Sequence, residues 1–533
     1  METKNIKKKE NISFALQVGL AALLPWICCV LYCLLQGKTV GQVYLPCSEW
    51  NDELFYYKQV EGIVKYGYPL GYFGFNESHA ISLSFAAWSP VLVFPWIIWG
   101  KIFGWGLLSP IICNLFWLSA SMVIFVLTAK PDWKQEGILG GLFCLFTPFV
   151  RYLLSGMPEI ICFGMLIVFY GLSINEIRQH KAWKLIVLLF MGVLLTLMRP
   201  YLILFLFLPC YLWIRQSVVA GIVGSIFVSG GALGGYALIK HYLGAEYFAD
   251  LFFTDWIKAF FERGIFGGAR YTLGKLYYMG KDFMIHLIEG FRSGMASGAF
   301  FAGFLAVGGI LALQTYFYVR EIWKNGKSET KEEKNEPALV IVTIHLLCSF
   351  VGMFFALLLM YKLTEGSKHL LTFIAIGIFI VSLYKTKYYR KAFFLGLVFL
   401  YFYLIMARSA YDYQVPFATD QRKEQIAFWQ ERMTEKLTLD MADAPNYDNV
   451  IIWVLYDRLQ DGKQVNIRWQ LLYALPKGLG ISCCKEDFIQ EHLEKLQSKY
   501  IATISGGDID KKLSQIGKNE LIRDEDMVIY QLR

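Results

Sequence analysis

Residues 50–57, WNDELFYY, begin with two adjacent carboxylates and end with two tyrosines. The run predicts a short helix with Asn51 as its N-cap, which places Asp52 and Glu53 in the first turn. The tyrosines follow one turn later on the same faces. Acids at this place often only complement the helix dipole. Here the run follows an apolar segment long enough to cross a membrane and precedes an aromatic-rich loop, and this position favours a functional role.

Apolar runs dominate the chain around this stretch. The 533 residues are 56% hydrophobic, 17% aromatic and only 18% charged. A soluble protein of this length carries more charge and spreads its apolar residues periodically. Runs able to cross about 30 Å of hydrocarbon recur from Ile12 to Met406. The sequence therefore predicts a polytopic α-helical membrane protein.

The charges and cysteines exclude other classes of protein. The net charge of +8 comes from basic loops between apolar runs, which is typical of the cytoplasmic side of a membrane and not of nucleic-acid binding. Most of the 11 cysteines lie in apolar runs, and no CxxC pair predicts a metal finger. The vicinal Cys483-Cys484 is predicted to stay reduced in a packed domain.

The basic residues also predict the orientation in a cell membrane. A lysine-rich N-terminus is placed in the cytoplasm, and residues 12–35 form a retained signal anchor, so the loop 37–80 lies outside. Whether residues 81–103 cross the membrane then decides on which side of it all later loops lie. As a full span they would move the later basic loops outside, whereas a broken, partly embedded helix, which Pro90 and Pro95 permit, keeps every basic loop inside. The second arrangement is the prediction.

The segment 185–214 contains Arg199-Pro200 at its centre. A proline breaks the helical ladder and an arginine in hydrocarbon is costly, so two short spans meeting at an outward corner are expected. Together with the other runs this gives about eleven spans and a long outer loop, 240–294. The spans other than the first are predicted at residues 105–128, 138–154, 160–174, 185–198, 200–214, 217–239, 296–319, 338–361, 370–384 and 392–407.

The multi-span domain is expected to cover residues 1–410, and the character of the chain changes after it. Residues 411–533 predict a small α/β domain on the outer face, with no Walker loop, GxGxxG or GxSxG motif. Its helices are expected at 421–437 and 486–496, its strands at 450–456, 500–504 and 527–532, and its glycine turns at 478–480 and 506–507.

Several ionisable residues stand at the outer mouths of the predicted spans, where such residues often serve a site. Glu159 opens a span and could be only a helix-start acid, and Lys368 next to His369 could be only an interfacial anchor. A carboxylate suits proton abstraction from a hydroxyl, and cations suit a phosphate held as a leaving group. The outer-face groups considered are Asp52, Glu53, Glu77, His79, Arg151, Glu159, Arg199, Arg270, Lys368 and His369.

The order of these motifs resembles the GT-C superfamily of integral-membrane glycosyltransferases, nearest to the protein O-mannosyltransferases and the lipid A aminoarabinose transferases. The similar motifs are the acidic-aromatic 52–57, a proline-containing interfacial helix within 88–104, a second acid at 158–159, a basic-proline corner at 199–200, and a basic-aromatic pair at 368–369.

The resemblance covers roughly residues 12–410, by pattern and order. The chain departs from the family in having Ser89 before Pro90, Glu159 where aspartate is common, and Lys368 where arginine is usual. Whether a divalent cation takes part varies within the superfamily, so the motifs leave that open, and they imply no other cofactor.

The resemblance implies transfer of a sugar from a polyprenyl-phosphate donor to a hydroxyl of an envelope glycan, lipid or protein, on the outer face of the cell membrane. The rival hypotheses are a flippase or transporter of lipid-linked sugars or envelope polymer, and an assembly subunit. The chain has no second copy of residues 52–57, which favours an enzyme. The implied roles are general base for Asp52, acceptor positioning for Glu53, substrate contact for Tyr56 and Glu159, and phosphate binding for Arg199, Lys368 and His369.

Overall fold

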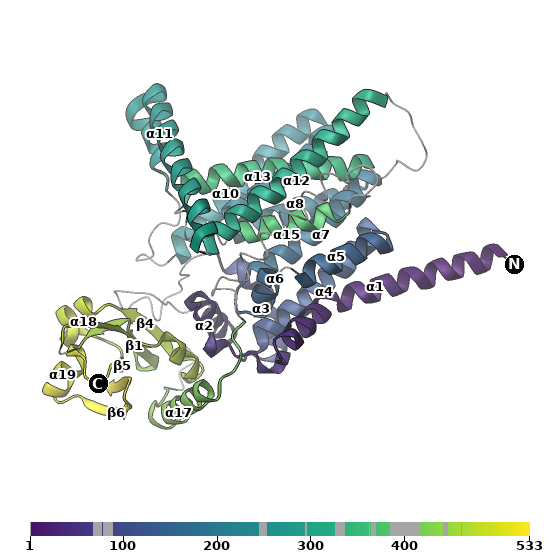
Figure 1. The fold of residues 1–533 in the computed structure, drawn as a ribbon. Coiled ribbons are helices and arrows are strands. Elements are labelled where there is room, and N and C mark those ends of the chain that lie inside the picture. The colour runs from purple at the N-terminus through teal and green to yellow at the C-terminus, as the bar shows by residue number, and fades with distance from the viewer. Residues whose placement is uncertain are drawn as a thin grey trace.

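In the computed structural model a bundle of helices carries a small sheet-containing domain at one end, beside α2 (Asn51–Tyr66) (Figure 1). The described residues are 2–67, 77, 89–145, 147–244, 253–293, 296–325, 336–361, 363, 369–383, 415–440, 446–459 and 461–533. The predicted span 392–407 and Lys368 lie outside them, as does most of the loop 68–88.

Six helices within the described residues are long and apolar enough to cross a bilayer, which confirms a multi-pass helical membrane protein. They are α1 (Glu2–Leu35), α4 (Ser109–Ala129), α7 (Glu159–Arg178), α10 (Val218–Leu243), α12 (Ala296–Asn325) and α13 (Glu336–Met360). The shorter helices of this part are α3 (Phe94–Phe103), α5 (Trp133–Leu145), α6 (Thr147–Leu153), α8 (Ala182–Met198), α9 (Ile203–Gln216) and α15 (Leu370–Val381).

The chain breaks at Arg199 as predicted. Helix α8 ends at Met198, a 3₁₀ turn, η5 (Pro200–Leu202), follows, and α9 begins at Ile203. Arg199 itself is extended, with φ −148° and ψ 120°, because a residue that precedes proline avoids the helical region. The two helices still pack against each other and against α10. The side chain of Arg199 is therefore presented from a fixed corner between two packed helices.

The described part of the segment 81–103 is short. A 3₁₀ turn, η4 (Pro90–Val93), leads into α3, and together they form an apolar run at 90–103. At a rise of about 1.5 Å per residue, fourteen residues extend about 21 Å, which is less than a bilayer core. The partly embedded helix stays a prediction, since residues 81–88 lie outside the described part of the chain.

The segment predicted as a long outer loop, 240–294, contains a helix that was not predicted. Helix α11 covers Asp255–Ser293, with a kink where Gly264 has a φ of 69°. The sequence contains no proline over this range, which permits a long helix, and its many aromatic and charged residues suggested a loop. Figure 1 shows α11 standing out from the bundle, and large apolar side chains on it, such as Phe261 and Phe266, are exposed.

The C-terminal domain is α/β as predicted and contains the two helices and three strands expected. Four further strands (β2, β3, β4 and β6) and a further helix (α19) were not predicted. Helix α17 covers Asp420–Lys436, and the main sheet has the strand order β4-β1-β5-β7-β6. Strand β1 pairs in parallel with β4 and β5, and β7 pairs antiparallel with β5 and β6. The elements are β1 (Val450–Val454), β2 (Tyr456–Arg458), β3 (Gln464–Asn466), η10 (Trp469–Ala474), β4 (Gly480–Cys484), α18 (Glu486–His492), β5 (Tyr500–Ile504), α19 (Asp508–Gln515), β6 (Asn519–Arg523) and β7 (Met527–Gln531).

Helices cover both faces of this sheet, so its central strands are buried throughout. Ile452 and Ile501 pack with residues of α18 and α19 on one face. Ile451 and Trp453 pack on the other face in the core that includes Trp429 of α17. Cys483 and Cys484 are buried in β4.

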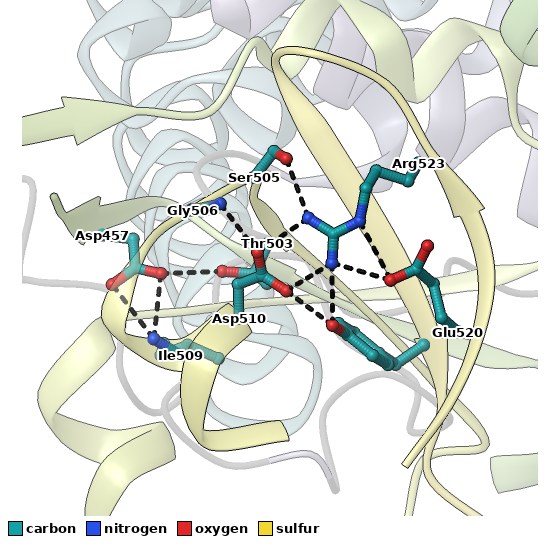
Figure 2. Close-up of polar contacts among 9 residues, drawn as sticks. Asp457, Thr503, Ser505, Gly506, Ile509, Asp510, Glu520 and Arg523 are labelled. Carbon is teal, nitrogen blue, oxygen red and sulfur yellow. Dashed lines mark hydrogen bonds and ion pairs between the residues drawn. The ribbon is translucent and has the colours of Figure 1, made fainter. Parts of the chain in front are cut away.

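The carboxyl end of the sheet is closed by an internal carboxylate (Figure 2). In a parallel sheet whose first strand lies between two others, as β1 lies between β4 and β5, the connections from neighbouring strands leave in opposite directions. Ligands usually bind at the carboxyl ends of the strands, where these connections diverge. Here Asp457 fills this place, accepting hydrogen bonds from Ile509 N at 3.1 Å, Asp508 N at 3.2 Å and Thr503 Oγ1 at 3.1 Å. A Cβ on Gly507 would lie 2.2 Å from Asp457 Oδ2. The first N–H groups of α19, which could otherwise bind a phosphate of a ligand, are thus occupied by Asp457.

An ion pair beside Asp457 ties α19 to the β6–β7 hairpin (Figure 2). Arg523 donates to both oxygens of Asp510, at 2.8 and 2.9 Å, and Tyr530 donates to Asp510 at 2.5 Å. Burial alone would raise the pKa of Asp510, but these donors hold that pKa below its usual value. Asp457 and Asp510 are therefore both used in holding the domain together.

The C-terminal domain is docked on the first loop. Backbone hydrogen bonds join Tyr44 N to Pro416 O and Ala418 N to Gln42 O, each at 2.7 Å. The carboxylate of Glu77 accepts from the backbone N–H groups of residues 497 and 498, both at 2.7 Å. The two parts must lie on the same side of the membrane, so the chain crosses it an even number of times between them. A span at 81–103 would make that number odd if the later spans are as predicted.

Candidate active site

Helix α2 begins one residue earlier than predicted. Trp50 takes the N-cap position and Asn51 is the first helical residue, so the prediction of Asn51 as the cap is wrong. Trp50 is fixed there because its backbone N–H donates to Ser48 Oγ at 3.1 Å. Asp52 and Glu53 do lie in the first turn. Since neighbouring helical residues point about 100° apart, these two acids enter different surroundings.

Glu53 forms a buried ion pair with Arg151 of α6. Its Oε1 lies 2.6 Å from Arg151 Nη2 and accepts a second hydrogen bond from Ser48 Oγ at 3.0 Å. Its Oε2 accepts from Gly156 N at 3.2 Å. The side chain of Glu53 has no exposed surface and that of Arg151 is 2% exposed. Both oxygens of Glu53 are therefore engaged in joining the first loop to the end of α6.

The Glu53–Arg151 ion pair, called the anchor from here on, also includes an aromatic side chain. The guanidinium of Arg151 lies 3.6 Å from the centroid of the Trp50 ring, and Trp50 packs against Tyr152 at 5.0 Å. The flat face of a tryptophan attracts a guanidinium, most strongly where water is excluded. The structure thus directs Glu53 to this anchor, and the acceptor-positioning role predicted for it has no geometric support here.

A second buried ion pair lies at the Arg199 corner. Arg199 Nη2 donates to Glu159 Oε1 at 2.7 Å, and Arg199 Nη1 donates to Tyr201 Oη at 3.1 Å. Arg199 Nη1 also lies 3.2 Å from His369 Nδ1. Arg199, Glu159 and His369 are all at least 97% buried. The structure thus brings together three residues that were predicted to share a site. They come from α7, from the corner between α8 and α9, and from the start of α15.

The hydrogen bond to His369 fixes the form of its ring. Arginine can only donate, so His369 Nδ1 must accept and its Nε2 carries the proton. In this arrangement the imidazole is neutral. His369 can offer a ligand an N–H donor and not a positive charge. The cation of the predicted Lys368-His369 pair would then be Lys368, which lies outside the described residues.

Tyr56 connects the Asp52 side of α2 to this corner. Burial raises the pKa of Tyr56 well above its usual value. The charge of Arg199 and a hydrogen bond from Arg199 lower this pKa, whereas the charges of Asp52 and Glu159 raise it further. The sequence placed the carboxylates of α2 and the cations at separate corners. In the structure Tyr56 hydrogen-bonds with Arg199 and lies near enough to Asp52 for the charge of Asp52 to affect its pKa. Asp52 is half-buried, in contrast to its fully buried neighbour Glu53.

The remaining outer-face groups have other places. Glu77 binds the C-terminal domain, Arg270 is exposed on α11, and His79 lies outside the described residues. Sequence reasoning missed Tyr201, although it directly follows Arg199-Pro200, and gave Arg151 no partner. Among the described residues, no three His, Cys, Asp or Glu side chains gather closely enough to hold a metal ion.

The chain is similar to solved structures of ArnT from Cupriavidus metallidurans. With ArnT bound to undecaprenyl phosphate the identity is 11% and the TM-score 0.40, over 97% of this chain and 98% of that chain. With apo ArnT the identity is again 11% and the TM-score 0.40, over 98% of each chain. ArnT is an aminoarabinose transferase of the GT-C superfamily, which the sequence motifs resemble. No protein-family model and no curated protein matches the sequence.

Proposed function

We propose that this protein is a glycosyltransferase that takes a sugar from a polyprenyl-phosphate donor at the outer face of the cell membrane. The observation that carries the proposal is the buried Arg199 corner, where Arg199 bonds to Glu159, Tyr201 and His369, with Tyr56 and the half-buried Asp52 of α2 nearby. A half-buried carboxylate and a fixed cationic group thus stand at the mouths of apolar helices. A lipid-linked donor would reach such a site from the bilayer.

Asp52 acts as the general base in this proposal. The carboxylate takes the proton of an acceptor hydroxyl while the hydroxyl oxygen attacks the anomeric carbon of the donor sugar. The bond between that carbon and the phosphate oxygen breaks, and polyprenyl phosphate leaves with the electron pair. The products are the glycosylated acceptor, polyprenyl phosphate and a proton on Asp52.

The donor phosphate is held on the other side of Tyr56. Because Glu159 balances the charge of Arg199, this pair by itself offers a phosphate little net attraction. Glu159 instead orients Arg199, and His369 also contacts Arg199. We assign to Lys368 the positive charge that stabilises the leaving phosphate. This assigns donor binding to Arg199, Lys368 and His369, with Glu159 as a positioning residue.

The outer-face location combines a contact with a charge pattern. The C-terminal domain packs on the first loop, so both lie on one side of the membrane. The basic loop 178–184 is expected on the cytoplasmic side, at the far end of α7 from Glu159. Exposed Phe261 and Phe266 of α11 supply lipid-facing surface. The ArnT structure contains undecaprenyl phosphate, and we propose a donor of that class for this chain.

The test uses the full chain in lipid nanodiscs with undecaprenyl-phosphate-linked, radiolabelled hexoses and pentoses and an extract of envelope glycan and lipid. Transfer of label to the extract, with release of undecaprenyl phosphate, is the expected result. If no donor is consumed, but the protein moves labelled lipid across the bilayer of reconstituted liposomes, the flippase hypothesis replaces this proposal.

A further inference from the structure

The C-terminal domain contains a polar cleft of about 860 Å³ that faces the first loop. Its size lies within the range of small-molecule sites, about 300–1,000 Å³. The cleft is formed by α17, the β2–β3 hairpin, the start of η10, the turn before β7 and Glu49 of the first loop. Its functional groups come from Glu49, Arg422, Gln425, Tyr456, Arg468, Trp469, Gln470, Glu525 and Asp526.

Two aromatic side chains line this cleft. Tyr456 stands at the start of β2 and Trp469 at the start of η10, and both are only partly buried. A partly exposed tryptophan beside polar groups offers a flat apolar face next to hydrogen-bonding partners. The C–H faces and hydroxyl groups of a pyranose need this combination. A nucleotide site at the end of the sheet is already closed by Asp457.

The polar side chains of the cleft are held by one another. Gln425 Oε1 accepts from Arg422 Nη1 at 3.0 Å and from Arg468 Nη1 at 3.3 Å. Gln425 Nε2 donates to Asp526 Oδ2 at 3.3 Å, and Arg468 pairs with Asp526 at 3.0 Å. A network fixed in this way loses little freedom when a ligand binds. The network presents planar hydrogen-bond donors and acceptors, at fixed positions, to the hydroxyl groups of a ligand.

The charge of the lining selects the class of ligand. Two arginines face three acids, Glu49, Glu525 and Asp526, so the formal balance is one negative charge. A phosphate-rich or otherwise polyanionic ligand would be repelled. A neutral glycan, or one that carries amino groups, matches this balance.

The cleft is also close to the proposed base. Gln470 Nε2 donates to Glu49 Oε2 at 3.1 Å and to Ser48 O at 3.4 Å. Glu49 precedes Asp52 by three residues, so their Cα atoms are at most about 11 Å apart. We propose that this cleft binds the carbohydrate part of the acceptor, a neutral or amino-substituted oligosaccharide, and presents its hydroxyl end to Asp52. The identification as acceptor rests on the proposed transferase function, whereas the binding itself does not.

The experiment measures binding to the full chain in nanodiscs without any donor. The probes are hexamers of N-acetylglucosamine, glucosamine, mannose and glucose, with a heparin hexasaccharide as the polyanion, followed by saturation-transfer NMR. At least one of the first four should bind better than heparin. Trp469→Ala and Arg468→Ala should each weaken that binding by about twofold to tenfold. Phe428→Ala, an exposed aromatic of α17 outside the cleft, should leave it unchanged.

The proposal is overturned if none of the four hexamers binds, if heparin binds best, or if both cleft variants behave like Phe428→Ala. Arg468 is a half-exposed side chain, so its variant keeps the test valid if Trp469→Ala does not fold. Hexamer binding without any sugar transfer would refute the proposed function and leave the cleft as a glycan site. Sugar transfer with an unchanged acceptor KM in both cleft variants would refute the cleft and leave the proposed function.

Discussion

The anchor, Glu53–Arg151, and the Arg199 corner, Arg199–Glu159, are both buried carboxylate–guanidinium pairs, yet they differ in what surrounds them. In the anchor both oxygens of Glu53 are bound, and Trp50 covers the guanidinium. In the corner Glu159 Oε2 has no hydrogen-bond partner, and Arg199 is shared among Glu159, Tyr201 and His369.

The two pairs differ in their carboxylates. In the anchor both oxygens of Glu53 are bound, and the donors without a partner, Arg151 Nε and Nη1, belong to a guanidinium that lies over the Trp50 ring. A buried pair that keeps an unsatisfied oxygen, and that adjoins the half-buried Asp52 through Tyr56, can respond to a ligand. Two acids that are adjacent in sequence thus divide between the two regions, Glu53 to the anchor and Asp52 to the corner.

The largest loss of stability is expected in the anchor. Arg151→Met leaves Glu53 buried without its partner, which should cost about 3–5 kcal/mol of unfolding free energy. Glu53→Gln should cost a similar amount, and the double variant less than the sum, because the two groups interact directly. Thermal unfolding of the purified protein measures all three. Additive, small losses would show that the anchor is not structural.

A smaller effect, on donor affinity alone, is expected at Lys368. Lys368→Met should weaken binding of undecaprenyl-phosphate sugar by about 1.5–3 kcal/mol, roughly 10- to 150-fold, with no change in thermal unfolding. Lys368→Arg should keep most of the affinity. Lys495→Met, an exposed lysine of the C-terminal domain, is the matched control. Unchanged donor affinity in Lys368→Met would make this lysine an interfacial anchor.

The smallest effect is expected at Tyr56. Tyr56→Phe removes the hydroxyl group that hydrogen-bonds with Arg199 and keeps the packing of the ring. Loss of one hydrogen bond is worth about 0.5–1.5 kcal/mol, so turnover should fall by roughly 2- to 12-fold. Tyr57→Phe, one residue along and stacked on Trp105 at 5.5 Å, should turn over at the wild-type rate. Equal rates in both variants would disconnect Tyr56 from the site.

The features that the sequence predicted correctly depend on local chemistry. Arg199-Pro200 breaks a helix wherever it is placed, because proline lacks an N–H and restricts the residue before it. The apolar runs predicted as strands at 450–456 and 500–504 form buried strands at 450–454 and 500–504. The first-turn position of Asp52 likewise follows from residues within one turn.

The features that the sequence did not reveal depend on contacts between distant residues. Glu53 and Arg151 are 98 residues apart, and nothing in either segment marks the other as its partner. Apolar helices such as α7 are buried on all sides, so their pattern does not indicate which face meets which neighbour. The docking of the C-terminal domain on the first loop also depends largely on backbone groups, which any sequence provides.

The most direct test of the central claim compares Asp52→Asn with wild type in the nanodisc transfer assay. If Asp52 is the general base, Asp52→Asn should keep donor binding and thermal unfolding and lower turnover by about 10²–10⁴-fold. Transfer at the wild-type rate by a folded Asp52→Asn protein would contradict the account, because the carboxylate would then be only a first-turn acid of α2.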